Sequence, residues 1–448
     1  MSAERPLTLF ERGLYLDGTR PVNIVFVAGI RGRLPPERLR HALARVQDKH
    51  PLLRCAIVQR DGRPWFRLLP RPAPIPLRVV ARTGDDDWRR QSAHERRQRF
   101  DGSREPLVRA VWLRGEGAGE LLLVCHHCIC DGRSIVTLLR EILALCDRPD
   151  LDIGGYRSLD PAERLLPDAV LGDRGLRRRS RWMAGLFGWL VRIRRPGPEL
   201  TYGDVYSIHW TLDQPASLRL ARRCEREGVT VFNALAAASV LGFRAVRGTK
   251  GAGRFMVPVD ARRFLPKLAD DHLFAMAPTV ALSPRVPHPE RTSETGFWTL
   301  ARTLRRDLDR RIGRLGAGVH RNLLGMEHLH ALFDRLIAHS RSRRSGRNVT
   351  LSWLGRLDLP EDYREFRIEA VHSPSATLQP TPANLLVVLG FAGRLEFALT
   401  SDEVSLPRAQ AMAIRETSLR LLRAHARLPE DAEARAGHAP ASPQADAT

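Results

Sequence analysis

In the first third of the chain, some segments repeat apolar residues with the period of a strand and others with the period of a helix, and the two kinds of segment follow one another. β-Branched residues at 22–30 predict a strand. Residues 36–49 repeat apolar side chains on one face of a helix, which ends before Pro51. Further strands are predicted at 52–58, at 65–69 and twice within 107–127, and a helix follows Gly132. This order predicts a mixed α/β region over residues 1–165.

The same alternation returns in the second half and predicts another α/β region over residues 201–428. Residues 206–212 alternate like a half-buried strand, and Thr230 can cap a helix that starts at Val231. The other predicted elements are helices at 215–227, 293–340 and 406–427 and strands at 255–260, 279–282, 349–353 and 385–389. Residues 429–448 are rich in Ala, Pro, Asp and Glu, which predicts disorder.

A basic amphipathic segment, residues 166–200, connects the two regions. Eight arginines between positions 174 and 195 are interleaved with Trp182, Leu186, Trp189 and Ile193 at helical spacing. This composition is typical of three situations: a solvated helix that covers apolar protein surface, a helix on a membrane surface, and a docking site for an acidic carrier protein. The sequence leaves these three interpretations open.

The charge and composition of the chain indicate which classes of molecule it can bind. The net charge is +22, and 43% of the residues are hydrophobic, as in a globular protein. Such a charge attracts acidic molecules, but the basic residues are spread along the chain and no recognised nucleic-acid module accompanies them, so no nucleic-acid partner is expected. The first residues lack a signal-peptide core, and no window approaches about 20 apolar residues. We expect a cytoplasmic monomer, which the basic segment could bring to the inner membrane surface.

The most informative motif is His126-His127-Cys128-Ile129-Cys130-Asp131-Gly132, which follows the apolar run 121–124. A histidine at the end of a buried strand can act as a general base near neutral pH. Three cysteines surround the pair, but Cys146 and Cys224 are single and offer no second pair of zinc ligands. We therefore expect no metal site and interpret these cysteines as small core residues.

The motif HHxxxDG is the hallmark of the coenzyme A-dependent acyltransferase superfamily, and the chain resembles that group. Chloramphenicol acetyltransferase, nonribosomal peptide condensation domains, polyketide-associated acyltransferases and alcohol acetyltransferases belong to it. Four weaker similarities follow in the expected order: His50-Pro51-Leu52-Leu53-Arg54, Thr230-Val231-Phe232-Asn233-Ala234-Leu235, Val257-Pro258-Val259-Asp260-Ala261-Arg262 and Ser352-Trp353-Leu354-Gly355.

The resemblance implies a fold and a reaction. The fold would have two lobes, each with a mixed, largely antiparallel sheet and flanking helices, and a tunnel at their interface. His127 would take a proton from an acceptor hydroxyl or amine as it attacks a thioester, without a covalent enzyme intermediate. The acyl donor would be acyl-CoA or an acidic acyl carrier protein, no cofactor would stay bound, and the product would belong to lipid or natural-product metabolism.

The resemblance also assigns supporting roles at the site. His126 would be a buried neighbour that shapes the strand end, and Gly132 would give the backbone room in the turn. Asp131 would form an ion pair with Arg262 of the other lobe and so hold the turn that carries His127.

The segment Ser352-Trp353-Leu354-Gly355 supplies three tunnel candidates, Ser352, Trp353 and Gly355. Family members usually carry a small polar residue, often Asn, where this chain has Trp353, so a polar contact at this position is lost. Two alternatives therefore stay open beside the acyltransferase. One is a free-standing condensation enzyme that joins carrier-bound groups, and the other is a non-catalytic relative that docks a carrier protein.

Overall fold

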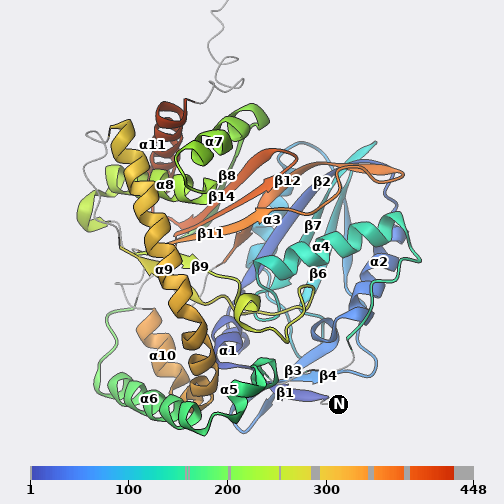
Figure 1. Ribbon diagram of the computed structural model, residues 1–448. Helices are drawn as coiled ribbons and strands as arrows, with labels where there is room; N and C mark the ends of the chain where they lie inside the picture. The colour runs from blue at the N-terminus through green and yellow to red at the C-terminus, as the bar shows by residue number, and fades with distance from the viewer. Residues whose placement is uncertain are drawn as a thin grey trace, which may run out of the picture.

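The structure, a computed structural model, describes residues 3–156, 159, 162–199, 203–251, 254–283, 293–341, 348–377 and 384–427. Two large sheets form two lobes side by side, with helices around them (Figure 1). The mixed α/β fold predicted from the sequence is confirmed. The predicted disordered segment 429–448 lies outside the described residues.

The first lobe is built on a five-stranded sheet in the order β12-β2-β7-β6-β5. Only the β5–β6 pair is parallel. Strand β7 is almost completely buried, which explains its unbroken apolar run, because a strand covered on both faces has no polar side to show. The strands are β2 (Asn23–Gly32), β5 (Leu77–Ala81), β6 (Val108–Arg114), β7 (Ala118–His126) and β12 (Phe366–Ala376).

Helices and a small second sheet complete the first lobe. Helix α2 packs against α4, and α3 packs against β2 and β7. Proline at the first turn of α2 removes an N–H that would have no partner there. A three-stranded sheet, β1-β4-β3, lies next to the N-terminus. The elements are β1 (Glu4–Pro6), α1 (Leu9–Tyr15), η1 (Leu16–Gly18), α2 (Pro36–Lys49), η2 (Pro51–Arg54), β3 (Cys55–Arg60), β4 (Arg63–Leu68), α3 (Asp87–Arg97) and α4 (Gly132–Asp147).

The second lobe is built on a six-stranded sheet in the order β10-β9-β11-β13-β14-β8. Helix α8 packs against α9 and α11, and their apolar faces form a second core with this sheet. The elements are β8 (Val205–Leu212), α7 (Gln214–Arg226), α8 (Val231–Gly251), β9 (Phe255–Pro258), η4 (Ala261–Phe264), β10 (Thr279–Leu282), α9 (Glu294–Met326), η6 (Glu327–Leu332), α10 (Phe333–Ser340), β11 (Val349–Arg356), β13 (Asn384–Phe391), β14 (Arg394–Asp402) and α11 (Arg408–Ala426).

The connector forms a layer at one end of the molecule. Its long helix α6 packs against α9, η6 and α10 (Figure 1). The helical spacing seen in the sequence is therefore confirmed for this segment. The elements are η3 (Ala162–Leu165), α5 (Asp168–Gly172) and α6 (Arg174–Ile193).

Strand β12 joins the lobes, because it belongs to the second half of the sequence and pairs antiparallel with β2 of the first. Its partner Gly32 has φ +111°, and a Cβ there would stand 2.5 Å from the carbonyl oxygen of Glu365, so only glycine fits this crossover. The division of the chain at residues 165 and 201 stays a prediction.

Most predicted elements are confirmed, whereas β1, α1, α3, β5, α5, β12 and β14 were not predicted. Helix α3 is mostly polar and so lacks a clear apolar face. Strand β12 alternates between buried and exposed residues only over its first four positions and loses this pattern in the rest of its length. Among the described residues, no single helix is long and apolar enough to cross a membrane. Helices α7 and α8 satisfy the length and composition criteria only together, and they are bent by 100° relative to each other.

Candidate active site

His127 follows the last residue of β7, at a point where the backbone is held on both sides. The His126 N–H donates to the Leu107 carbonyl at 2.9 Å, and the His127 N–H donates to the Val22 carbonyl at 2.7 Å. Both contacts continue the sheet beyond the strand end. The position of His127 is therefore fixed by the central strand of the first lobe.

A cavity of about 440 Å³ opens beside His127, and both lobes contribute to its wall. The first lobe supplies α1 and the motif, and the second supplies α10 and the ends of β9, β10 and β11. His127 and Asp131 are the only titratable side chains among the described lining residues. The cavity thus offers an apolar volume of ligand size with one imidazole in its wall.

The imidazole of His127 is suited to accept a proton. Burial lowers its pKa below the ordinary 6.5, while backbone groups of His127 and Cys130 and the Asp131 carboxylate act in the opposite direction. The ring is therefore neutral at pH 7. Its Nδ1 atom is buried, which leaves Nε2 as the nitrogen that can meet a substrate.

His126 lies in the core of the first lobe, since successive side chains of a strand point to opposite faces. Its ring packs near Tyr15 and Phe100, and its Nδ1 accepts a hydrogen bond from the Cys128 N–H at 3.3 Å. Burial, with smaller contributions from His127 and Arg109, lowers the pKa of His126 to about 3. His126 is thus a neutral core side chain.

Asp131 and Arg262 form an ion pair across the lobes, as the sequence led us to expect. The Arg262 Nη1 atom donates to Asp131 Oδ2 at 2.9 Å, and its Nη2 atom donates to the His272 carbonyl at 2.7 Å. Asp131 Oδ1 accepts hydrogen bonds from the Ser134 N–H and hydroxyl, both at 2.8 Å. Both members of the pair are buried, so the second lobe holds the turn that follows His127.

Two side-chain features shape the turn itself. Asp131 caps helix α4, because its carboxylate accepts the free Ser134 N–H of the first turn. At Gly132 a Cβ would stand 2.5 Å from Leu354 Cδ2 of β11. Glycine therefore lets a side chain of the other lobe approach the turn.

The three tunnel candidates of β11 lie beside the cavity and not among its described lining residues. Among the described lining residues, Thr350 is the one that belongs to β11. Trp353 packs against the second core, 6.4 Å from the Phe232 ring, and Gly355 has φ +76° at a bulge of β11. The roles of Ser352, Trp353 and Gly355 in a tunnel stay predictions.

The cysteines around the motif are buried free thiols. Burial raises the pKa of Cys128 and Cys130 well above 9.0. Among the described residues, no three His, Cys, Asp or Glu side chains are placed to hold a metal ion.

Two walls of the cavity, α1 and α10, were not predicted from the sequence to lie at the site. A signal for α1 was present, because Thr8 and Glu11 form a capping box: the Glu11 N–H donates to Thr8 Oγ1 at 3.2 Å, and the Thr8 N–H donates to Glu11 Oε2 at 2.8 Å. Leu9, Phe10, Gly13 and Leu14 of this helix reach the cavity. Helix α10 was predicted as part of a longer helix. Phe333, Leu336 and Ile337 recur at helical spacing and form the apolar face of α10 that lines the cavity, but this pattern does not say what the face contacts.

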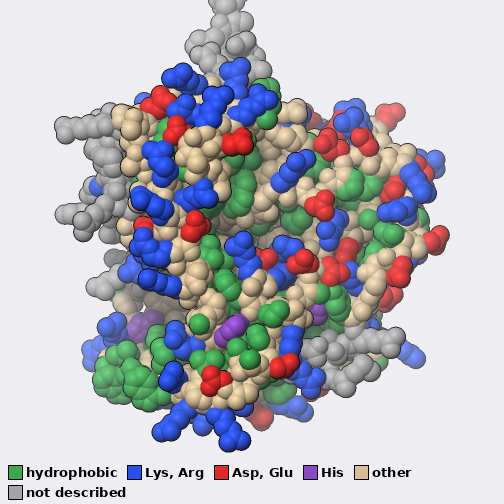
Figure 2. All heavy atoms as spheres, viewed as in Figure 1, with side chains coloured by type: hydrophobic (Ala, Val, Ile, Leu, Met, Phe, Trp, Pro, Cys, Tyr) green, Lys and Arg blue, Asp and Glu red, His purple; other side chains and the backbone are tan. Residues whose placement is uncertain are grey.

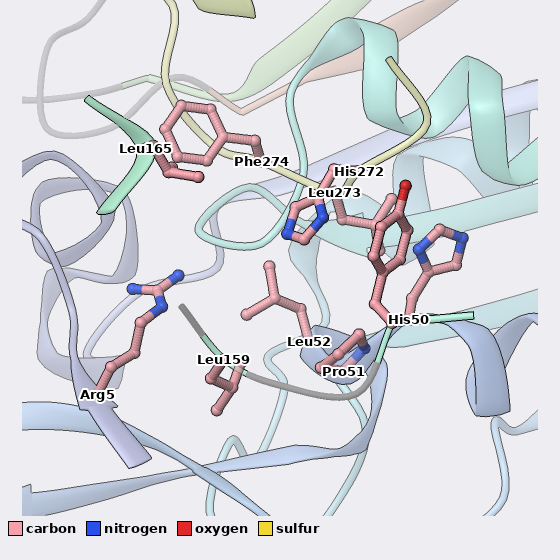
Figure 3. Close-up of a pocket in the computed structure, with 10 residues that line it drawn as sticks. Arg5, His50, Pro51, Leu52, Leu159, Leu165, His272, Leu273 and Phe274 are labelled. Carbon is pink, nitrogen blue, oxygen red and sulfur yellow. The ribbon is translucent and has the colours of Figure 1, made fainter. Parts of the chain in front are cut away.

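A second cavity, shown in Figure 3, is much smaller. It lies between His50, His272 and Phe274 and measures about 20 Å³, which is enough for roughly one water molecule. Its wall does not include His127. The cavity beside His127 is therefore the candidate active site.

Comparison with known proteins shows similarity in the first lobe and in the overall fold. The condensation-domain family matches residues 13–150, which include the whole HHxxxDG motif. Polyketide synthase associated protein 5 from Mycobacterium tuberculosis superposes with a TM-score of 0.64 at 19% identity, over 94% of this chain and 97% of that one. The trichothecene 15-O-acetyltransferase TRI3 from Fusarium sporotrichioides gives 0.70 at 13% identity, over 94% and 95%. Residues 13–150 are therefore similar to the condensation-domain family, and the chain shares its fold with these two proteins.

The curated proteins that the chain resembles include large synthetases. The probable non-canonical nonribosomal peptide synthetase CymA of Salinispora arenicola is 29% identical over 228 residues, which is 47% of this chain and 3% of CymA. Chondramide synthase cmdD of Chondromyces crocatus is 28% identical over 268 residues, which is 52% of this chain and 6% of the synthase. The chain thus matches only a small part of each synthetase.

Proposed function

We propose that the protein transfers an acyl group from a thioester to a hydroxyl or amine acceptor, with His127 as the general base. The observation that carries this proposal is the placement of a neutral imidazole in the wall of an apolar cavity between the lobes. An acyl chain fits an apolar cavity, and a thioester needs little activation beyond positioning and one proton transfer.

The reaction begins when the acceptor oxygen or nitrogen attacks the thioester carbonyl carbon. His127 Nε2 takes the acceptor proton as the new bond forms, and a tetrahedral oxyanion results. The oxyanion then collapses, the carbon–sulfur bond breaks, and the leaving thiolate receives the proton from His127. No covalent enzyme intermediate is required. In this scheme Asp131, Arg262, Gly132 and His126 position the turn and take no part in bond changes.

The donor is coenzyme A or a phosphopantetheinyl carrier protein, and no cofactor needs to stay bound. Both donors are acidic, and the net charge of +22 attracts either. Six free cysteines fit a reducing compartment, so we place the reaction in the cytoplasm, carried out by a monomer in lipid or natural-product metabolism.

A second candidate is a condensation reaction between two carrier-bound groups. The match to the condensation-domain family and to peptide synthetases supports it. The chemistry at His127 would be the same, and only the source of the two substrates would differ.

The test is release of free thiol from an acyl-CoA series in the presence of alcohol or amine acceptors. We expect His127→Ala to lower kcat/KM by about 10²–10⁴-fold, the usual contribution of a general base. His94→Ala, which changes an exposed histidine of α3, is the matched control and should keep full activity. Equal turnover of the His127→Ala variant would refute the general-base role.

The pH profile gives a second readout. A general base must be unprotonated, and burial lowers the pKa of His127, so activity should hold through neutral pH and fall only below the ordinary 6.5. An acidic limb at or above 6.5 would contradict this assignment. Turnover with an acyl-loaded carrier protein but with no acyl-CoA would favour the condensation reaction.

A further inference from the structure

Helix α6 exposes its large apolar side chains and buries its small ones. The side chains that face the protein are Ser180, Ala184, Gly188 and Val191. They allow close contact with α9 and η6: a Cβ at Gly188 would stand 3.0 Å from Leu332 Cδ1, and one at Gly325 would stand 3.7 Å from Ala184 Cβ. The usual pattern of a surface helix is the opposite, with large apolar residues toward the core.

The outward face of α6 carries an apolar stripe. Trp182, Leu186, Trp189 and Ile193 follow helical spacing, and Trp182 is 67%, Trp189 54% and Ile193 55% exposed. Met183 and Phe187 widen the stripe and are exposed as well. Six of the nine exposed large hydrophobic residues among the described part of the chain lie on this one helix. Such clustering marks an interaction surface.

The charges around the stripe have one sign. Residues 174–195 contain eight arginines and no acidic residue. Within the described residues, no carboxylate forms an ion pair with any of these arginines. Figure 2 shows the apolar patch at the lower left of the molecule, over α6, with Lys and Arg side chains on its borders.

Helix α6, whose outward face carries the stripe, lies next to a wall of the candidate active site. Helix α10 contacts α6, and its residues Phe333, Leu336 and Ile337 line the cavity that contains His127. Two side chains of α10 hold the end of α6: Arg335 donates to the Arg192 carbonyl, and His339 Nε2 lies 3.3 Å from the Val191 carbonyl oxygen. One helix thus separates the exposed stripe from the apolar cavity.

We propose that α6 is an interfacial helix that seats the protein on an anionic lipid surface. Tryptophans and aliphatic side chains enter the boundary between headgroups and acyl chains, and the arginines bind the acidic headgroups. A lipid surface fits better than an acidic protein because the stripe lies on the outward face of a single helix, and the combination of Trp with Arg is typical of membrane interfaces.

Binding of α6 to the lipid places the cavity beside the membrane surface. This position favours substrates that are themselves dissolved in the lipid. An acyl donor or acceptor with a long apolar chain, partitioned into the lipid, would lie close to α10 and the cavity. This part of the inference rests on the proposed function, whereas the binding of lipid does not.

Co-sedimentation of the full chain with vesicles tests the proposal, with pure phosphatidylcholine compared with phosphatidylcholine containing phosphatidylglycerol. We expect binding to the anionic vesicles that weakens with added salt. The variant Trp182→Glu/Trp189→Glu should bind at least about tenfold more weakly, because it places charges in the apolar stripe. Both side chains are exposed, so the fold should persist, and circular dichroism checks this.

Leu218→Glu is the matched control, because Leu218 is 48% exposed on α7 and lies outside the stripe. It should bind as the unchanged protein does. Binding that the Trp182→Glu/Trp189→Glu variant retains in full, or absence of binding to anionic vesicles, would overturn the proposal. The proposal would also be overturned if the unchanged protein formed a dimer in solution that the Trp182→Glu/Trp189→Glu variant did not form. It would be overturned as well if an acidic carrier protein, and not vesicles, bound the stripe.

Two further measurements separate this inference from the proposed function. Transfer from a water-soluble acyl-CoA to a water-soluble acceptor should be unchanged in the Trp182→Glu/Trp189→Glu variant. His127→Ala should bind vesicles normally. A protein that binds vesicles but transfers no acyl group would refute the proposed function alone.

Discussion

Adjacent residues of the motif have opposite environments. His126 and His127 follow each other at the end of β7, yet one ring packs in the core and the other faces the cavity, since a strand turns successive side chains to opposite sides. Both pKa values are lowered by burial, but of the two only His127 lines the cavity. The different roles that we propose for them follow from this orientation.

The prediction at the scale of single residues concerns Asp131, whose carboxylate both caps α4 and neutralises Arg262. Asn can keep the cap but not the charge, so Asp131→Asn leaves the buried Arg262 without its closest countercharge. Breaking a buried pair costs about 3–5 kcal/mol, and we expect a lower free energy of unfolding and slower acyl transfer. Denaturant unfolding and thiol release measure both effects.

Asp260→Asn is the control for this variant. Asp260 also contacts Arg262 Nη1, at 3.2 Å, but its side chain is more exposed than that of Asp131. Its loss should therefore cost less. An equal loss of stability in the two variants would contradict the central position of Asp131.

At the scale of elements, a buried charge network holds the end of α2. Lys49 Nζ lies 2.6 Å from Glu141 Oε1 of α4 and 2.5 Å from Asp271 Oδ2 of the second lobe. His50 Nε2 contacts the other oxygen of Glu141 at 2.7 Å, beside the small cavity of Figure 3. Burial raises the pKa of Asp271, but the hydrogen bonds from Lys49 and Tyr156 outweigh it and hold the pKa at about 2.

We expect Lys49→Met to lower the melting temperature clearly, because it leaves the buried carboxylate of Glu141 without its lysine. Lys267→Met removes a lysine from an exposed pair with Asp168, and such pairs contribute only about 0–1 kcal/mol. Thermal unfolding of both variants tests the comparison. A Lys49→Met variant as stable as Lys267→Met would show that the network does not fasten α2 to α4 and to the second lobe.

At the scale of the whole molecule, a cluster of aromatic rings fills part of the contact between the lobes. Trp88 of α3 stacks on His372 of β12 at 3.8 Å and meets His209 of β8 edge-on at 4.9 Å. The three rings therefore join the first sheet to the second. Arg89 and Arg96 of α3 are the charged groups that act on the two histidines.

Because two histidines of this cluster are buried, we expect the free energy of unfolding to decrease in acid. Burial lowers the pKa of His209 to about 3 and that of His372 to about 4, from 6.5. Below 6.5 the unfolded chain binds protons at both histidines while the folded protein does not, so the free energy of unfolding falls as the pH decreases from 6.5 to about 4. Each histidine contributes at most about 1.4 kcal/mol per pH unit in this range.

Denaturant unfolding at a series of pH values measures this slope. His372→Phe keeps a ring against Trp88 but cannot be protonated, so its slope between pH 6.5 and 4 should be shallower. His94→Phe changes an exposed histidine of α3 and should retain the original slope. An unchanged slope in His372→Phe would exclude this histidine as a source of the acid sensitivity.

The sequence by itself determined the order of most elements, and it pointed to His127 as the group for which we propose proton transfer. Periodicity reports which positions share a face, and the motif reports which groups can move a proton; both are local properties. It also favoured the Asp131–Arg262 pair, although only through resemblance to a family.

The tertiary structure decided the rest, because it depends on contacts between residues far apart in the chain. Strand β12 joins the sheet of the other half, α1 and α10 complete the cavity, and Leu354 takes the space that Gly132 leaves. The pattern of α6 showed an amphipathic helix, but whether its large or its small side chains meet the protein was settled by the close approach of α9 and η6. The small side chains of α6 pack against the protein, and its tryptophans are exposed to solvent.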